Sequence, residues 1–390
     1  MRTPTGILAS VVLAVAGAAL LTSLPSCNYF EKHDTEGVIM MGPGKLPGLQ
    51  EIGLHQVWQR QVSLEPGEQV KNTYRVGQSI YVTTSISRII RMEADTGILR
   101  WSNGLGRENF DIYKPIELKG ADNAPTGEVL VVSRGEAFMF NIGTGDQTRE
   151  PAHLGISVSA DPVVVGNTLC VGGADTFYGL YMDRLGMKRW RVPAAGDLFV
   201  SAPVALDNNV LVASRSGHLW RISADTGDWD WKDRKTNGIV TAGVAVDFNA
   251  LYVPCLDQRV YAFRADTGGE LWEQQLEGRL ENAPALGGPV VMVHTAEGKL
   301  WALNRLTGVI AWQMDDVDQI ATVGEENVWI GDKSGNIKCI ALDSGREVAS
   351  APAPGVKLFV RNTLDEKVIL VDNTGLVGVY ANSKTQSPTP

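Results

Sequence analysis

A short phrase, a Gly followed four residues later by a Trp, recurs along the chain and constrains the fold more than any other feature. In its clearest copy, residues 262–272, a strand-like apolar run ends in Asp-Thr-Gly and a second run leads to Trp. The full copies are Gly97/Trp101, Gly186/Trp190, Gly227/Trp231, Gly268/Trp272 and Gly308/Trp312. Weaker copies turn at Gly145 and Gly345, where Arg149 and Ala349 replace the Trp. A spacing near 40 residues indicates a repeat architecture.

Each repeat reads as four short antiparallel strands. In one unit, residues 202–206, 210–214, 218–222 and 229–232 are apolar or alternate, and Asn, Asp and Gly occupy the turns between them. Gly and Asn accept the positive φ that tight hairpin turns require. Equivalent hairpins between the second and third strands turn near eight positions: Ser87, Gly135, Asp175, Gly217, Gln258, Gly298, Gly335 and Gly375.

The two ends of the repeat region complete one another. The last unit has no outer strand after its third strand at 376–380, whereas residues 55–62 resemble an outer strand with no unit before it. If 55–62 complete the last unit, the ring closes without an open sheet edge. The sequence therefore predicts an all-β protein, an eight-bladed β-propeller of four-stranded antiparallel blades that the N-terminal strand closes.

The repeated tryptophans predict a packing role. Placed just after a tight turn, an indole can lie between its own blade and the next, against a neighbouring Gly. A ligand cage is the alternative, but large apolar residues that recur in a repeat usually serve packing. We expect this structural docking from six residues: Trp58, Trp101, Trp190, Trp231, Trp272 and Trp312.

The N-terminal segment predicts export. Arg2 precedes an apolar run at 7–21 that is short for a membrane span. Residues 24–27, Leu-Pro-Ser-Cys, resemble the lipobox of bacterial lipoproteins, which implies an acylated Cys27; an ordinary secretory signal with a stray cysteine is the alternative. We expect a signal peptide at 1–26, a flexible tether at 27–50, the propeller at 51–382 and a disordered tail at 383–390.

Charge and motif content narrow the function. A net charge of −9 argues against nucleic acid as a partner. Four cysteines, none adjacent to another, suggest neither a disulfide scaffold nor a redox pair, and the five histidines lack ligand spacing. The acidic run at 315–318 is interpreted as an exposed loop. We therefore assign no catalytic, cofactor-binding or metal-binding residue and expect no enzymatic activity.

The Thr-Gly-x-x-x-Trp repeats, with Ala262 and Ala302 six places before their Gly, resemble the tryptophan-docking motif of the pyrroloquinoline-quinone (PQQ) propellers. That resemblance implies one of two functions. One is a PQQ- and Ca²⁺-dependent quinoprotein dehydrogenase. The other is a non-catalytic scaffold, because a lipoprotein signal before eight such blades resembles the BamB family of the outer-membrane β-barrel assembly machinery. A propeller of another envelope complex is a third possibility.

The BamB resemblance also implies partners, location and contacts. The partners would be a barrel assembly subunit and nascent outer-membrane proteins, with the lipid anchor on the periplasmic side of the outer membrane. In BamB a loop with an Arg before a Ser-Ala-Pro strand meets the barrel subunit. Here that loop carries Leu198 and Phe199, with Leu198 where Arg would stand, and a similar phrase begins at Arg279. These three residues are the predicted partner contacts; for Arg279 a solvated loop position is the alternative.

Overall fold

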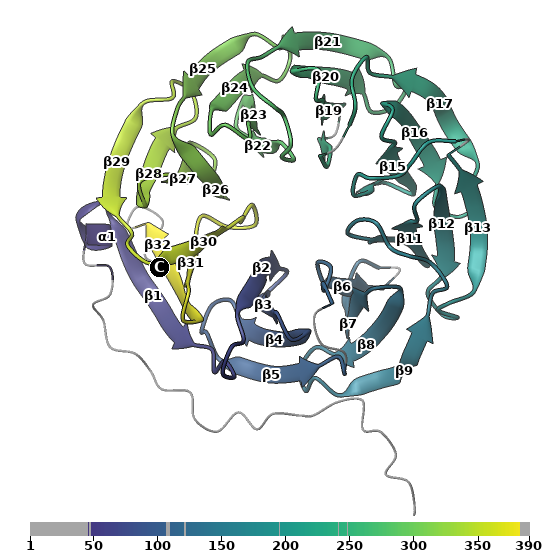
Figure 1. The fold of residues 1–390 in the computed structure, drawn as a ribbon, viewed down its shortest axis with the longest axis horizontal. Coiled ribbons are helices and arrows are strands. Elements are labelled where there is room, and N and C mark those ends of the chain that lie inside the picture. Colours follow the sequence, from purple (N-terminus) through teal and green to yellow (C-terminus); the bar gives the residue numbers. More distant parts are fainter. Residues whose placement is uncertain are drawn as a thin grey trace, which may run out of the picture.

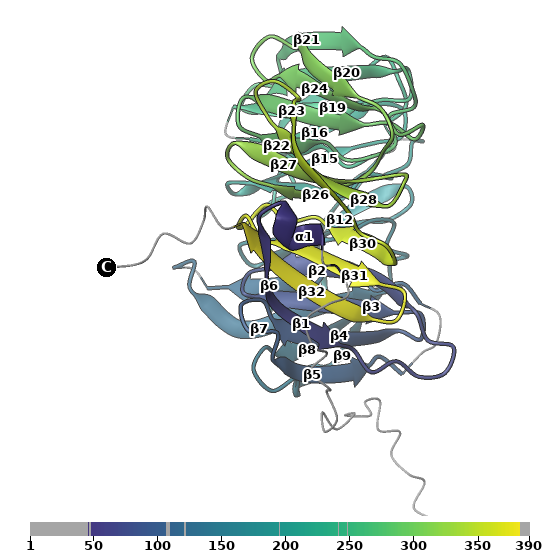
Figure 2. The same cartoon turned by 90° about the vertical axis from the view of Figure 1, so that its left-hand side faces the viewer.

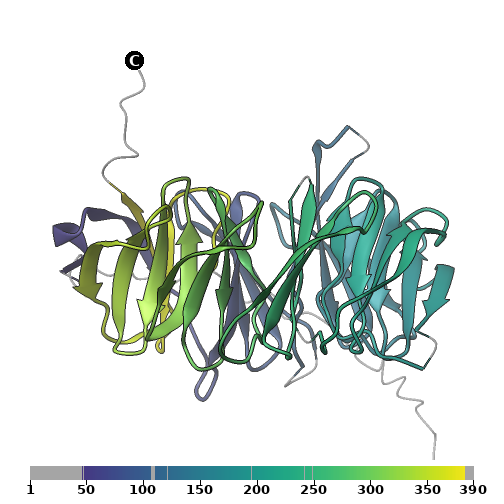
Figure 3. The same ribbon diagram turned by 90° about the horizontal axis from the view of Figure 1, so that it is seen from above.

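The computed structural model describes residue 46 and residues 48–382, except 107–109, 121, 195, 241 and 248. The described strands form eight four-stranded sheets, and all neighbouring strands within them run antiparallel. The sheets stand like blades around a central axis (Figure 1). Seen from the edge, the ring is a disc with two faces on which the turns gather (Figure 3). This is the eight-bladed propeller that the sequence predicts.

Seven blades take four consecutive strands each, from the centre outwards. Blade 1 consists of β2 (Val70–Val76), β3 (Ser79–Thr84), β4 (Arg88–Glu93) and β5 (Leu99–Gly104), and blade 2 of β6 (Ile116–Lys119), β7 (Pro125–Ser133), β8 (Glu136–Asn141) and β9 (Gln147–His153). Blade 3 consists of β10 (Val163–Val165), β11 (Thr168–Gly172), β12 (Thr176–Tyr181) and β13 (Lys188–Pro193). Blade 4 consists of β14 (Val204–Leu206), β15 (Asn209–Ala213), β16 (His218–Ser223) and β17 (Trp229–Lys235).

Blades 5 to 7 follow the same order. Blade 5 consists of β18 (Ala245–Val246), β19 (Ala250–Pro254), β20 (Arg259–Arg264) and β21 (Glu270–Gln275). Blade 6 consists of β22 (Ala285–Gly287), β23 (Val290–His294), β24 (Leu300–Asn304) and β25 (Ile310–Met314). Blade 7 consists of β26 (Val317–Val323), β27 (Asn327–Asp332), β28 (Asn336–Ala341) and β29 (Glu347–Pro352).

Blade 8 joins the two ends of the described chain. Its inner strands are β30 (Val356–Val360), β31 (Val368–Asp372) and β32 (Leu376–Asn382), and its outer strand is β1 (Leu54–Gln61). The β1–β32 register runs from Leu54 opposite Asn382 to Gln61 opposite Leu376, with an irregularity between Gln56 and Trp58. Figure 2 shows β1 beside β32. The strand count had predicted this pairing.

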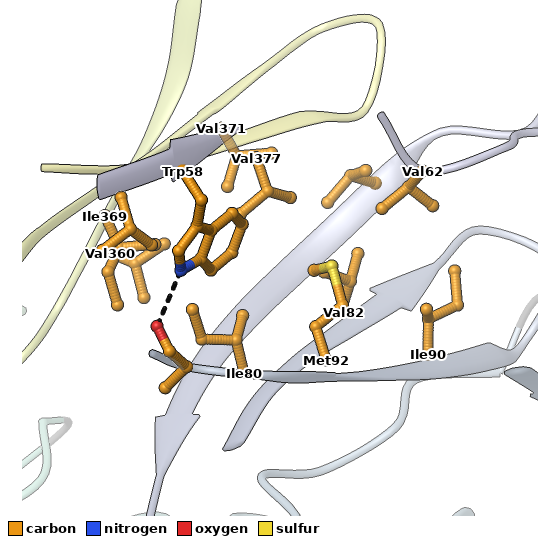
Figure 4. Packing of buried hydrophobic residues seen from close by; sticks show 13 residues of the cluster. Trp58, Val62, Ile80, Val82, Ile90, Met92, Val360, Ile369, Val371 and Val377 are labelled. Atoms are coloured by element: carbon orange, nitrogen blue, oxygen red, sulfur yellow. Dashed lines mark hydrogen bonds between the residues drawn. The ribbon is translucent and has the colours of Figure 1, made fainter. Parts of the chain in front are cut away.

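The core lies between adjacent blades. Central strands such as β3 are buried along their whole length, whereas outer strands such as β21 expose most of their residues. Between blades 8 and 1, Trp58 packs with Val371 and Val377 on one side and with Ile80 and Met92 on the other (Figure 4). Apolar side chains from both sheets thus leave water together, which holds each blade to the next.

A short helix precedes β1. It spans Gly48–Glu51, lies beside β29 and β1 (Figure 1), and packs Leu49, which is 1% exposed, with Ala351 and Ala353. The tether boundary drawn at residue 50 therefore falls inside folded structure. A single helical turn is too short to show a helical period, so sequence periodicity does not predict this helix.

No helix in the described part of the chain is long and apolar enough to cross a membrane. The expected signal peptide, nearly all of the expected tether with Cys27, and the expected tail at 383–390 lie outside the described residues.

Candidate functional site

The six repeat tryptophans share one arrangement. Each indole Nε1 donates a hydrogen bond to a backbone carbonyl in the turn between the third and fourth strands of the following blade. The bonds are Trp58 to Ala94 at 2.9 Å, Trp101 to Ile142 at 2.8 Å, Trp190 to Ala224 at 2.8 Å, Trp231 to Ala265 at 3.4 Å, Trp272 to Arg305 at 2.9 Å and Trp312 to Leu342 at 2.8 Å. The tryptophans therefore bridge neighbouring blades and leave other surfaces for function.

The Gly of each turn makes room for the ring. At Gly308 the φ angle is 72°, and a Cβ added there would lie 2.7 Å from the ring of Trp272. A side chain at this position is excluded twice, by backbone conformation and by contact. Five more glycines meet a tryptophan of the preceding blade in this way: Gly97, Gly145, Gly227, Gly268 and Gly345. The period near 40 residues therefore reflects a contact in each case between a Trp and the turn Gly of the next blade.

The predicted partner contacts lie on loops that lead into inner strands. Leu198 precedes β14 and Arg279 precedes β22; Ile239, before β18 of the blade between them, holds the corresponding place. The Leu198 carbonyl accepts a hydrogen bond from the Arg215 N–H at 2.7 Å, and the Arg215 carbonyl accepts one from the Val240 N–H at 3.2 Å. Backbone hydrogen bonds thus connect the first two loops. We call Leu198, Ile239 and Arg279 the loop row.

Two members of the loop row are exposed apolar residues. Leu198 is 38% exposed and Ile239 is 40% exposed. Sequence reasoning missed Ile239, although Gly238 precedes it much as Gly278 precedes Arg279, so alignment of the repeats would have found it. Phe199 differs: it is 1% exposed and lies between Phe177 and Trp220, at centroid distances of 5.6 and 5.3 Å. It is therefore a core residue and not a surface contact.

Asp197 holds the first loop in place. Its carboxylate accepts hydrogen bonds from the N–H groups of Leu198, at 2.8 Å, and Ser216, at 3.1 Å. Burial alone would raise the pKa of Asp197, but hydrogen bonds from Ser214, Ser216 and the backbone lower it to about 2. The carboxylate stays charged at neutral pH, and Leu198 is presented from a loop that is already ordered.

Arg279 borders an acidic cleft of about 340 Å³. Its guanidinium lies 3.3 Å from Glu281 and 3.4 Å from Glu297, and 63% of its side chain is exposed. The cleft itself is lined by residues that include Glu277, Glu297, Asp315, Asp316 and Lys299. Such exposed ion pairs add little stability, so these charges remain available to a partner. The acidic run found in the sequence thus lies close to Arg279.

The dehydrogenase alternative requires residues that could hold PQQ and Ca²⁺. Ca²⁺ needs several converging oxygen ligands, and within the described residues no group of three or more His, Cys, Asp and Glu side chains is arranged so that it could hold a metal ion. Cys170, Cys255 and Cys339 are buried in separate blades. Burial raises the pKa of the Cys170 and Cys255 thiols to about 12, so neither forms a thiolate at neutral pH.

The family model described as outer membrane protein assembly factor BamB matches residues 139–240 and 233–358, which together exceed half of the chain. The chain belongs to the BamB family. Among curated BamB proteins, that of Yersinia pestis is 26% identical over 205 residues, 47% of this chain and 52% of the relative. That of Bordetella pertussis is 27% identical over 295 residues, 71% of this chain and 70% of the relative.

Solved structures share the BamB-type fold. BamB from Moraxella catarrhalis superimposes with a TM-score of 0.67 at 17% identity, covering 86% of this chain and 99% of that one. A quinohemoprotein alcohol dehydrogenase from Pseudomonas putida gives a TM-score of 0.63 at 12% identity, covering 90% of this chain and 80% of that one. Both likenesses show the PQQ-like propeller fold alone, and the fold hosts more than one function.

Proposed function

We propose that this protein is a non-catalytic, lipid-anchored scaffold on the periplasmic side of the outer membrane that takes part in assembling outer-membrane β-barrel proteins. The observation that carries the proposal is the BamB family match over residues 139–358, since BamB proteins are named as outer membrane protein assembly factors. The matched region includes the whole loop row. The lipobox-like residues ending at Cys27 support the anchor.

The loop row is the proposed docking surface for a barrel assembly subunit. Leu198 and Ile239 offer apolar area on ordered loops, while Arg279 and the acidic cleft offer charges at their side. Protein interfaces commonly combine an apolar centre with a polar rim. Nascent outer-membrane proteins are the proposed cargo, and nucleic acid is not a proposed partner because the chain carries a net charge of −9.

A pull-down tests the docking surface. We expect the tagged full-length protein to recover a barrel assembly subunit from envelope extracts, and the double variant Leu198→Asp/Ile239→Asp to recover about tenfold less, because it places charge in the apolar centre. The matched control is Ile98→Asp, because Ile98 is 43% exposed and lies on the outer part of blade 1. Equal recovery by all three proteins would remove the loop row from the proposal. Absence of every barrel subunit from the wild-type sample would remove the assembly role.

The anchor is tested separately. We propose a signal peptide at 1–26, lipidation of Cys27 and a tether from there to the helix at Gly48–Glu51. Cys27→Ser is expected to move the protein from the membrane fraction to the soluble periplasmic fraction, since acyl chains supply the membrane affinity. Mass spectrometry of the mature N-terminus gives a direct readout, and an unmodified Cys27 in membrane-bound protein would contradict the proposed anchor.

A further inference from the structure

A second cleft lies between blades 5 and 6, on the face opposite the loop row. Its lining comes from the turns after β18, β20, β22 and β24, and antiparallel strands place these turns at the other end of the blades from the loops that enter them. Figure 1 shows these two blades next to one another. The cleft volume is about 480 Å³, which lies within the range of small-ligand sites.

Leu306, at the rim of this cleft, departs from the repeat. Two residues before the turn Gly, four other copies carry Asp: Asp95, Asp225, Asp266 and Asp343. At this turn the Asn304 Oδ1 accepts hydrogen bonds from the N–H groups of Leu306, at 2.9 Å, and Thr307, at 3.1 Å. Leu306 is therefore not needed for the turn, and it is 88% exposed. With Leu271, 44% exposed, it forms an apolar wall that no part of the described structure covers.

Arg305 is the cation of the cleft with unused donors. Its Nε donates to the Val290 carbonyl at 3.1 Å, but its Nη1 is 3.8 Å from Asp247 Oδ2, beyond hydrogen-bond distance. Asp247 itself is occupied, because it accepts hydrogen bonds from the Asn249 N–H at 2.9 Å and from the Tyr252 hydroxyl at 3.0 Å.

The second arginine of the cleft is matched. The Arg264 guanidinium donates to both oxygens of Asp266 at 3.1 Å. The two Nη groups of Arg305 thus make no hydrogen bond within the described structure, and Nη1 has Asp247 as an ion-pair neighbour at 3.8 Å. A planar guanidinium whose Nη groups make no hydrogen bond suits a carboxylate, which it binds through two parallel hydrogen bonds.

We propose that this cleft binds the C-terminal end of a polypeptide. The terminal carboxylate bonds to Arg305, the last apolar side chain packs against Leu306 and Leu271, and the side-chain amides of Asn249 and Asn304 face the peptide groups. Capture of a terminal carboxylate is a recurring mode of peptide recognition. The site is separate from the loop row and does not depend on the proposed assembly role.

A peptide-binding experiment tests this site. The probe is a fluorescein-labelled peptide, Gly-Ser-Gly-Ser-Val-Phe, with a free carboxylate. The control probe is the same peptide with a C-terminal amide. Fluorescence anisotropy with the full-length protein is expected to show at least about tenfold tighter binding of the free acid. Leu306→Asp is expected to weaken that binding about tenfold or more, because the variant repels the carboxylate and removes apolar contact.

Two further variants separate the parts of the site. Arg305→Met keeps the aliphatic stem and is expected to bind acid and amide equally, while thermal melting verifies that it is folded. Val348→Asp, on the rim of blade 7 and 48% exposed, is the matched control and should bind like the wild type. The proposal is overturned if acid and amide bind equally to the wild type, if neither binds at about 1 mM, or if dodecanoate binds this cleft while the peptide does not.

Discussion

Six of the eight blade junctions close with a tryptophan, and two do not. At the six, the indole lies against a Gly of the next blade and donates to a carbonyl of the same turn, as Trp272 does at Gly308 and Arg305. At the other two, the equivalent positions carry Arg149 on β9 and Ala349 on β29. The junctions without tryptophan show which part of the arrangement the fold requires.

Arg149 replaces the hydrogen bond of the indole. Its Nη1 donates to the Met182 carbonyl at 3.1 Å, in the turn between the third and fourth strands of blade 3. The side chain is 45% exposed, so it buries much less area than an indole does. The blade 2–3 junction thus keeps the polar contact and loses much of the apolar one.

Ala349 faces a different neighbour. The following blade has no turn between its third and fourth strands, because β32 is the last described strand and β1 comes from the other end of the chain. The helix at Gly48–Glu51 lies there instead, and Leu49 belongs to the same apolar cluster as Ala351, with Ala349 packed against it. A Trp at 349 has no Gly to lie against, and a small residue leaves room for the helix.

Removal of an indole should have the largest effect on the stability of a blade junction. Trp272→Ala is expected to lower the free energy of unfolding by about 3–5 kcal/mol, because it leaves a large cavity between blades 5 and 6. Urea titration followed by circular dichroism measures the change. An unchanged unfolding midpoint would contradict the docking role that we assign to the six tryptophans.

Leu49→Ala addresses the junction that the helix closes. We expect a loss of about 2–4 kcal/mol in the free energy of unfolding, since a fully buried Leu is truncated. The same urea titration is used, with Ile52→Ala as a partly buried control in the same segment, which should lose less. A loss below that of the control would mean that the helix does not take the place of a tryptophan.

The junction between blades 8 and 1, which we call the seam, contains an ion pair in addition to Trp58. Arg75 lies 3.2 Å from Asp365, and its side chain is only 4% exposed. Burial alone would raise the pKa of Asp365, but hydrogen bonds from Asn362 and the Lys367 N–H, with Arg75 nearby, lower it. A lowered pKa in the folded protein stabilises above the unfolded value near 4, and this stabilisation is lost as the pH falls through the folded value.

Acid titration tests the seam. Between about pH 5 and about pH 3 the wild-type protein should lose about 1 kcal/mol more stability than Asp365→Asn, in which this group no longer titrates. At neutral pH the variant should be less stable than the wild type by a similar amount. Identical pH profiles for the two proteins would show that Asp365 makes no titrating contribution to the seam.

Arg149→Ala should have the smallest effect. Because the guanidinium is partly exposed, we expect a loss of about 1 kcal/mol or less in the free energy of unfolding. Differential scanning calorimetry of this variant and of Trp272→Ala gives the ratio of the two losses of stability, one for each kind of junction. A loss as large as that of the tryptophan variant would mean that the hydrogen bond, and not the buried area, holds neighbouring blades together.

The repeat in the sequence predicts much of the fold because the Trp of one copy contacts the turn Gly of the next blade. The strands around Asn209–Ala213 and the closure by β1 follow from strand counting. The helix at Gly48–Glu51 could not be predicted, since one helical turn has no readable period and the stability of the helix comes from packing Leu49.

The candidate surface was less predictable. Leu198 and Phe199 are adjacent and both apolar, yet one is exposed and the other lies between two aromatic rings. Residues in irregular loops lack the period of two that separates faces in a strand, so burial there depends on tertiary contacts. The unused donors of Arg305 likewise depend on where Asp247 forms its own hydrogen bonds.

The pairing of β1 with β32 has a consequence for how the protein is made. Leu54 pairs with Asn382, more than 300 residues further along the sequence, so a chain that emerges N-terminus first holds β1 unpaired until residues 376–382 have been synthesised. Contacts of such long sequence separation form slowly. Truncation within residues 376–382 would therefore free the first strand as well as the last, and quality control would meet an open ring with two exposed edges.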